Sequence, residues 1–409
     1  MNLKNLISII VIYAFCVIAW IVLGGVTFAR TNESSFALKN SVINLYGDNL
    51  VINHPYLVYI TQEIKTSKNR DGYTTSELIN IENPILPEKS NVLINITLDP
   101  RKKGVLWFPT FKAEYVASYE FNISGYKDKN IFLRSELSST DSIYKNVEIS
   151  INDNKLNDIR FLVNKEKLEI EKSNEKVTLK IGYNTTGLEK FNYNITPYHN
   201  DIAQIDAFKL NINTDFHNID FIDKTMSPTR KNSNHNGWEL MWELDKSITG
   251  KDIGIIIPGK PNPGDIIPRA VFAAPFSLLF YFMIIIVISI ITKEKIHPIN
   301  YFFLGCAFFS FHLMYSYFSD HINIYFAFLI SSIVSIFLVS SYLKLFASSK
   351  LAFIYSPVAQ IIYLVVFSYS FFYKGFSGLI ITIISVLSLF FIMQLTGKID
   401  WHKIFNEEE

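Results

Sequence analysis

The sequence predicts an α+β membrane protein with an N-terminal transmembrane helix, a β-rich domain and a C-terminal bundle of five transmembrane helices. Apolar residues run from Leu6 to Ala29, most of the charge follows, and the chain from Ala270 to Thr396 is again almost continuously apolar. A hydrocarbon core about 30 Å thick needs roughly 20 apolar residues per helical crossing. The expected divisions are an anchor at 1–30, a β-rich domain at 31–268, a helical domain at 269–397 and a tail at 398–409.

The composition excludes some classes of protein. The formal net charge is +1, whereas a nucleic-acid-binding protein normally shows a strongly basic face. We therefore expect no nucleic-acid partner. The two cysteines, Cys16 and Cys306, both lie in apolar segments, so no disulfide framework is expected in the middle of the chain.

The first apolar segment has features of both a signal peptide and an anchor. Lys4 precedes it, and Thr27-Phe28-Ala29 loosely matches a cleavage site. However, the stretch from Leu6 to Ala29 is longer than the 7 to 15 apolar residues of a typical signal peptide, and it is long enough to span. We favour an uncleaved anchor.

Five further crossings are expected after the polar region. Their orientation follows from the excess of lysine and arginine on cytoplasmic flanks. With the amino terminus inside, seven such residues flank the cytoplasmic side and three, Arg30, Arg269 and Lys374, flank the other. The polar domain is thus expected in the periplasm, with both termini in the cytoplasm. The crossings are Val271–Thr292, Ile299–Phe318, Ile322–Leu343, Leu351–Phe372 and Phe376–Leu395, and the seven residues are Lys4, Lys293, Lys295, Lys344, Lys350, Lys398 and Lys403.

The polar domain shows the two-residue period of β-strands. From Glu114 to Ile123, aromatic and aliphatic residues alternate with polar ones, and the same holds for Val177 to Tyr183 and Phe208 to Ile212. Tyr56 to Ile60 also resembles a strand, and Asn152-Asp153-Asn154 is typical of a turn. We expect packed sheets, in one or two sandwich-like units.

Two segments frame this domain. Ser34 or Ser35 is expected to cap a separate short helix after the anchor. The Pro- and Gly-rich run from Ile257 to Gly264 cannot sustain a helix and marks the other boundary.

The sequence contains no convincing catalytic motif. The serine-x-x-lysine pattern of penicillin-binding enzymes occurs three times, but its companion motifs are missing, and chance is the better explanation. Solvated strand faces or turns account for the pairs equally well. The pairs are Ser124 with Lys127, Ser142 with Lys145, and Ser173 with Lys176.

No metal site is predicted. His235 has Glu239 four residues later, but Asn234, Asn236 and Gly237 disfavour a helix there. His217 lies near Asp215 and Asp220, which is also compatible with a solvated turn. We assign no catalytic, cofactor-binding or metal-binding residue and expect no cofactor.

Ionisable residues inside a crossing are costly and often functional. His312 is the clearest case, with Asp320-His321 at the end of the same segment. Its functional interpretation is a proton or solute path, and the alternative that we prefer is a neutral imidazole bonded to a neighbouring helix. The main other polar residues of the crossings are Gln360 and Gln394. A transporter usually has more polar residues in its crossings.

Several motifs resemble the CreD family of inner membrane proteins. They include His297-Pro298 with Tyr301 opening a crossing, Ser319-Asp320-His321 closing it, and Ile399-Asp400-Trp401 after the last crossing. Arg101 and Gly104, Asn152 to Ile159, and Gly237-Trp238 before Trp242 follow in the expected order, so the resemblance covers nearly the whole chain.

The sequence departs from the family pattern at three places. Asp320 replaces a glutamate, Lys374-Gly375 replaces an acidic residue, and Gly397 replaces an arginine. We interpret these changes as favouring a scaffold role for the helical part.

The resemblance implies a bacterial inner-membrane protein associated with envelope integrity and envelope stress, without a defined reaction. Our first hypothesis is a periplasmic domain that binds an envelope component or a protein partner. The alternatives are a small-solute transporter or channel, and a membrane-tethered enzyme that modifies the envelope. The sequence does not indicate an oligomeric state.

Overall fold

The computed structural model describes residues 3–68, 74–104, 106–137, 142–171, 175–196, 202–373 and 375–397. They form two compact units. The membrane unit comprises Met1–Leu38, Gly104–Leu106 and Pro261–Glu409, and the β unit comprises Lys39–Lys103 and Trp107–Lys260. The predicted tail at 398–409 lies outside the described residues.

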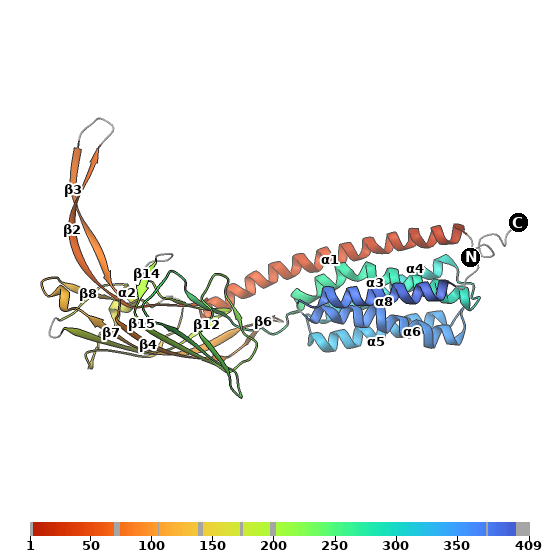
Figure 1. Cartoon of the computed structure of the whole chain (residues 1–409). Coiled ribbons are helices and arrows are strands. Elements are labelled where there is room, and N and C mark those ends of the chain that lie inside the picture. The colour runs from red at the N-terminus through yellow and green to blue at the C-terminus, as the bar shows by residue number, and fades with distance from the viewer. Residues whose placement is uncertain are drawn as a thin grey trace. The chain divides into compact units, whose positions relative to one another are not determined.

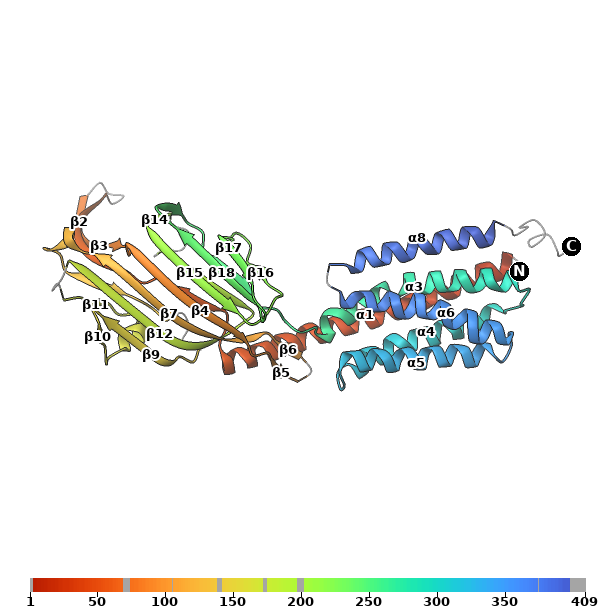
Figure 2. The same ribbon diagram turned by 60° about the horizontal axis from the view of Figure 1, so that its bottom comes forward.

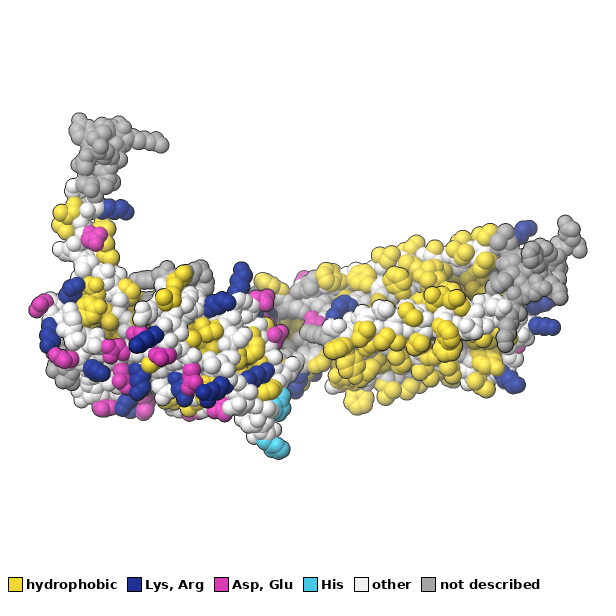
Figure 3. Space-filling model, viewed as in Figure 1, with side chains coloured by type: hydrophobic (Ala, Val, Ile, Leu, Met, Phe, Trp, Pro, Cys, Tyr) yellow, Lys and Arg dark blue, Asp and Glu magenta, His cyan; other side chains and the backbone are white. Residues whose placement is uncertain are grey.

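The predicted fold class is confirmed, because a β-rich region lies in the chain between apolar helices (Figure 1). Hydrophobic side chains cover the visible face of the helices, whereas charges of both signs are mixed over the β unit (Figure 3). This difference is the one expected between a surface facing lipid and a surface facing water.

Helix α1 runs without a break from Leu3 to Tyr46 and is 44 residues long. The expectation of a separate helix starting at Ser34 or Ser35 is therefore wrong. No glycine or proline interrupts the chain between Val26 and Tyr46, so nothing in the backbone stops the helix. It ends at Gly47, whose φ of +91° suits glycine.

The membrane unit contains the predicted C-terminal helices. Among the described residues, five helices of the chain are long and apolar enough to cross a membrane, α1 and four C-terminal ones. Helix α4 is not one of them, although its 21 residues would reach about 31 Å at 1.5 Å per residue. Asn300, His312 and its tyrosines lower its hydropathy. The C-terminal helices are α3 (Pro263–Ile291), α4 (Pro298–Phe318), α5 (Ile324–Leu343), the crossing Leu351–Phe372 and α8 (Ser377–Thr396).

The crossing Leu351–Phe372 is wound irregularly. Turns of π-helix at Leu351–Tyr355 and Ile361–Val366 flank α6 (Ser356–Gln360), and α7 (Phe367–Tyr369) leads into a 3₁₀ turn. Pro357 lies in this crossing and lacks a backbone donor, which favours such departures from regular winding.

The N-terminal part of α1 packs against the C-terminal helices (Figure 1). The buried Trp20 ring meets Phe309 edge to face at 5.1 Å. The Tyr13 hydroxyl donates to the Pro275 carbonyl at 3.0 Å. Helix α1 is therefore an integral part of the bundle, and not only a tether.

One large sheet dominates the β unit (Figure 2). Its strand order is β10-β9-β12-β7-β4-β15-β18-β17, with β15 parallel to β4 and the other pairs antiparallel. The three strands predicted from alternation are confirmed as β7, β12 and β15. The strands are β4 (Lys89–Leu98), β7 (Thr110–Asn122), β9 (Lys145–Ile151), β10 (Asn154–Lys155), β12 (Lys176–Leu188), β15 (Ala207–Thr214), β17 (Arg230–Ser233) and β18 (Trp238–Leu244).

Smaller sheets complete the β unit. Residues from the large sheet and from both four-stranded sheets share one hydrophobic core, which includes Leu57, Tyr115, Phe191 and Trp242. The expected packing of sheets is thus present. The four-stranded sheets are β1 (Leu50–Asn53), β13 (Lys190–Asn194), β20 (Ile253–Ile256) and β16 (Asp220–Phe221), and β11 (Leu168–Glu169), β8 (Ile131–Arg134), β2 (Tyr56–Lys68) and β3 (Thr74–Ile85). The remaining elements are β5 (Arg101–Lys103) with β6 (Leu106–Phe108), β14 (Ala203–Ile205) with β19 (Ser247–Thr249), α2 (Arg160–Asn164) and a 3₁₀ turn at Ser124–Tyr126.

Two local features follow from residue type. The predicted turn between β9 and β10 is confirmed, and Asn152 and Asp153 adopt positive φ angles that these residues tolerate. Gly237 precedes β18 where the chain passes the Thr214 backbone, and a Cβ there would collide with the Thr214 carbonyl oxygen. This close approach requires glycine.

Candidate functional site

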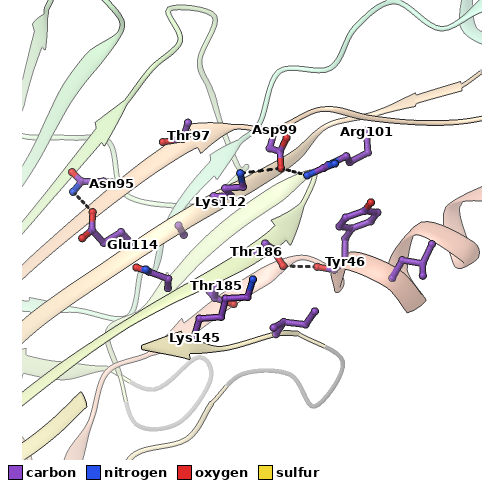
Figure 4. Close-up of a pocket in the computed structure, with 14 residues that line it drawn as sticks. Tyr46, Asn95, Thr97, Asp99, Arg101, Lys112, Glu114, Lys145, Thr185 and Thr186 are labelled. Atoms are coloured by element: carbon purple, nitrogen blue, oxygen red, sulfur yellow. Dashed lines mark hydrogen bonds and ion pairs between the residues drawn. The ribbon is translucent and has the colours of Figure 1, made fainter. Parts of the chain in front are cut away.

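The outer face of the large sheet carries the candidate site. Strand β7 alternates strictly, so Tyr115 and Tyr119 enter the core while Lys112 and Glu114 point outward. A cavity of about 520 Å³ lies on this face, lined by β4, β7, β9 and β12 and by Leu45 and Tyr46 at the end of α1 (Figure 4).

A charged cluster occupies one end of this cavity (Figure 4). Arg101 donates to the Asp99 carboxylate at 2.5 Å, and the Lys112 ammonium is 3.4 Å from the same carboxylate. Partial burial acts to raise the pKa of Asp99, but the hydrogen bond from Arg101 and the charge of Lys112 outweigh it and lower the pKa below its ordinary value. The Arg101 guanidinium also lies 5.1 Å from the Tyr46 ring centroid. These contacts hold the cluster in place.

Amide side chains occupy the rest of the cavity. Asn95 donates to Glu114 at 3.0 Å, and Asn213 on the next strand donates to Asn95 at 2.9 Å. Asn184 of β12 lies opposite Glu114 of β7 and Lys145 of β9. Hydrogen-bonding side chains therefore extend across β9, β12, β7, β4 and β15 at one level of the sheet.

A second cavity, of about 620 Å³, lies further along the same strands. Leu93 and Val116 line it and are 39% and 50% exposed, which is high for apolar side chains in a sheet. Its lining lysines are paired, Lys180 with Asp153 at 2.6 Å and Lys155 with Glu148 at 2.9 Å.

The sheet also buries a chain of polar side chains. His54 Nδ1 lies 2.8 Å from the Tyr193 hydroxyl, which is 2.9 Å from that of Tyr119, which is 2.6 Å from that of Tyr115. Ser90 Oγ is 3.4 Å from His54 Nε2. Burial lowers the pKa of His54 to about 3 and raises the pKa values of the three tyrosines. The imidazole is only 3% exposed, which places this chain in the core.

The first of the three serine and lysine pairs is engaged with separate partners. Ser124 donates to Asn122 at 2.7 Å, whereas Lys127 pairs with Glu175 at 2.7 Å. Ser142 precedes β9 and Lys145 begins it, with the Lys145 side chain exposed on the outer face. Lys176 lies 4.0 Å from Glu88, and Ser173 lies outside the described residues.

Among the described residues, the histidines of the β unit are not grouped with other metal ligands. His235 is exposed just before β18, and the His217 ring packs edge to face on Trp238 at 6.1 Å. Over the part of the chain that the structure describes, no three His, Cys, Asp or Glu side chains could hold a metal ion.

Polar side chains also line the inside of the membrane unit. His312 is fully buried among the rings of Trp20, Phe308 and Phe311. Gln360 is fully buried as well and donates to Ser335 at 3.5 Å, whereas Gln394 is exposed on α8. Among the described residues, Gln360 Oε1 has no hydrogen-bond partner. The preferred interpretation of His312, an imidazole bonded to a neighbouring helix, gains no support.

Comparison with known families identifies the family of this chain. A family model described as inner membrane protein CreD matches residues 2–223 and 265–402, which is most of the chain. The chain belongs to the CreD inner membrane protein family. No curated protein matches it significantly. Gly237, Trp238 and Trp242, which also suggested the resemblance, lie outside the matched residues.

Some of the positions at which we expected departures from the CreD pattern have local structural roles. The Asp320 carboxylate accepts a salt bridge from Arg30 of α1 at 2.9 Å, and Arg30 also donates to the Ser316 carbonyl and lies over the Tyr317 ring. Gly375 has a φ of +84° before α8, a conformation that favours glycine. Gly397 ends α8, and Lys374 and the motif at 399–401 lie outside the described residues.

The residues of the cavities were largely missed by motif analysis. Glu114 and Lys180 were recognised only as the polar side of a strand, and Lys145 only as part of a chance motif. The available signal was the recurrence of Asn and Lys at the outward positions of several strands.

Proposed function

We propose that this CreD-family protein holds its β unit on the periplasmic side of the inner membrane, where the outer face of the large sheet binds a component of the cell envelope. Through this binding the protein contributes to envelope integrity. The observation that carries the proposal is the pair of adjoining cavities, of about 520 and 620 Å³, on one sheet face. Sites of this size accommodate small molecules or segments of polymers.

The charge distribution supports this orientation. Lysine dominates the flanks assigned to the cytoplasm, while Arg30 and Arg269 flank the β unit in the sequence. The apolar helices at both ends of the chain give the β unit two attachments to the bilayer.

We propose binding without catalysis. The serine and lysine of the Ser124 pair have separate partners, and the buried His54 contacts Tyr193 and Ser90 in the core. A nucleophile needs a base within hydrogen-bond reach and access to substrate. The outer face offers amides and paired charges, which suit recognition.

A deletion at the structural boundaries tests the role of the β unit. Residues 47–260 are replaced by a flexible linker, which keeps α1 and the bundle complete. We expect normal membrane insertion and loss of the envelope phenotype, measured as detergent sensitivity in a strain that lacks the native gene. Full function of the inserted helices alone would overturn the proposal.

In-cell crosslinking tests the binding surface. A photoreactive amino acid at Asn184, in the first cavity, is compared with one at Asn232, an exposed position on the same sheet face but outside both cavities. We expect an envelope component to be captured from position 184 and not from position 232. Equal capture at both positions, or none at either, would contradict the proposed site.

A second function, passage of a small solute, is favoured by His312 and Gln360. Both are fully buried in the membrane unit, and Gln360 Oε1 has no partner within the described residues. Intramembrane ionisable residues often mark a pathway. Under this alternative, His312→Phe lowers solute flux into vesicles without reducing insertion, whereas Gln394→Leu, at an exposed position, leaves flux unchanged. Unchanged flux in both variants would eliminate the pathway.

A further inference from the structure

The two cavities form one continuous groove. Strand β4 contributes Asn91 and Leu93 to one cavity and Asn95 and Thr97 to the other, and these are successive outward positions of a single strand. Strands β7, β9 and β12 likewise line both cavities. An elongated ligand that lies across these strands, where the two cavities adjoin, therefore contacts residues of both.

The strand register divides the groove into three rows. The middle row, which we call the apolar row, consists of Gly182, Val116 and Leu93 at matching levels of β12, β7 and β4. Because successive outward positions are two residues apart, a polar row lies about 6.8 Å to either side of it. The polar rows are Lys180, Ser118 and Asn91, and Asn184, Glu114 and Asn95.

Most charges in the groove are neutralised within the protein. Lys180 pairs with Asp153, Lys155 with Glu148, and Lys112 and Arg101 with Asp99. Because each pair places opposite charges side by side, the net charge that a ligand meets in the groove is small, which lowers the attraction for a charged ligand. The remaining hydrogen-bonding capacity belongs to Lys145 and Glu114 and to amides and hydroxyls, including those of Asn91, Asn184 and Ser118.

We propose that this groove binds a neutral linear glycan. The apolar faces of successive sugar rings lie on the apolar row, and ring-edge hydroxyl and acetamido groups bond to the two polar rows. The inference rests on the proposed function and names the class of envelope component. Gly182 has no side chain, so the surface of the sheet is accessible at this position. A Cβ there would contact only the Tyr115 carbonyl, so the space above it is empty of protein atoms.

Other elongated ligands fit the groove less well. An acyl chain would bury the amides of Asn91 and Asn184 without hydrogen-bond partners, which is unfavourable. An extended peptide gains its main-chain hydrogen bonds at a sheet edge, whereas this groove lies on a sheet face. A glycan uses the apolar row and both polar rows together.

Binding is tested on the full chain in nanodiscs by titration calorimetry with the β-1,4-linked hexamer of N-acetylglucosamine. We expect saturable binding that Asn184→Leu and Val116→Asp each weaken at least tenfold. Both residues are exposed, so neither change disturbs the core. Asn232→Leu, on the same face outside the groove, is the matched control and should change the affinity less than twofold.

The outcomes separate this inference from the proposed function. Absence of saturable hexamer binding, or equal loss in the Asn232 control, overturns the glycan assignment. If position 184 then captures a lipid or a protein in cells, the groove still binds an envelope component and only the ligand class is wrong. If position 184 captures nothing, both proposals fail.

Discussion

The two units differ in how their buried tyrosine side chains are connected. In the β unit, the buried hydroxyls of Tyr115, Tyr119 and Tyr193 and the imidazole of His54 join in one hydrogen-bonded chain. In the membrane unit, the Tyr281 hydroxyl lies 2.7 Å from Ser356 Oγ, whereas the Tyr315 hydroxyl, which is also fully buried, has no partner among the described residues.

This difference indicates which interactions fix the arrangement of each unit. A buried polar group without a partner costs free energy, so a satisfied chain fixes one arrangement of the sheets around it. The membrane unit is held instead by apolar and aromatic packing, such as Trp20 against Phe309. The unpartnered groups of the bundle therefore do not add to its stability.

The largest expected effect is a pH dependence centred on His54. Its pKa is lowered from 6.5 to about 3 by burial, so the unfolded chain binds more protons than the folded chain between these values. The free energy of unfolding of the β unit should fall as pH decreases through that window, by about 1.4 kcal/mol per pH unit. Urea unfolding of the full chain at pH 7 and pH 5 measures this.

The matched variant for this experiment is His54→Gln, which keeps a polar group and removes the titration. Ser90, Tyr119, Tyr193 and Phe208 contact His54, and Arg134 and Glu136 line the same cavity, so the comparison with the variant isolates the imidazole from these groups. We expect a clearly shallower slope in the variant. An unchanged slope would mean that other groups cause the pH dependence.

The next effect concerns the middle of the buried chain. Tyr119→Phe removes the hydroxyl that contacts both Tyr115 and Tyr193. Because two buried hydroxyls lose a partner, the free energy of unfolding of the β unit should fall by about 1–3 kcal/mol. Chemical denaturation measures the change, and a loss below a few tenths of a kcal/mol would contradict the role of the chain.

A smaller effect is expected at the ion pair between α1 and the bundle. Asp320→Asn removes the charge opposite Arg30, whose side chain is 38% exposed, so the cost should be about 1 kcal/mol or less and decrease in high salt. Thermal unfolding at two salt concentrations checks this. Asp320→Glu should restore the salt dependence, and a cost that is independent of salt would show that the carboxylate acts by packing.

The smallest effect is expected for Tyr315→Phe in the membrane unit. Its hydroxyl has no partner in the described part of the chain, so its removal should leave the stability within about 0.5 kcal/mol of the parent or raise it. The same thermal assay provides the measurement. A loss as large as that of Tyr119→Phe would remove the contrast between the units.

Local patterns predicted the elements well. Strict alternation identified β7, β12 and β15, and long apolar runs identified most of the crossings. The continuation of α1 to Tyr46 was missed, because the polar segment from Arg30 to Asn40 has neither the apolar run of a span nor a helix breaker. Ser34 and Ser35 resembled a cap but lie inside the helix.

The candidate site could not be predicted, because it is assembled by non-local pairing. Leu93 and Val116 come from strands that lie opposite each other only after folding, and β15 joins β4 in parallel from far along the chain. The Arg30–Asp320 pair likewise joins residues from opposite ends of the sequence. Residues such as Asn184 belong to no sequence motif. Only the pairing of the strands shows that they lie in one row across the sheet.

The most direct test of the account is the side of the membrane on which the groove lies. Asn184→Cys is introduced into a chain whose Cys16 and Cys306 are replaced by alanine, and spheroplasts are treated with a membrane-impermeant maleimide. We predict that the cysteine is labelled in intact spheroplasts as fully as after lysis. Labelling that appears only after lysis would place the β unit in the cytoplasm and contradict the proposed function.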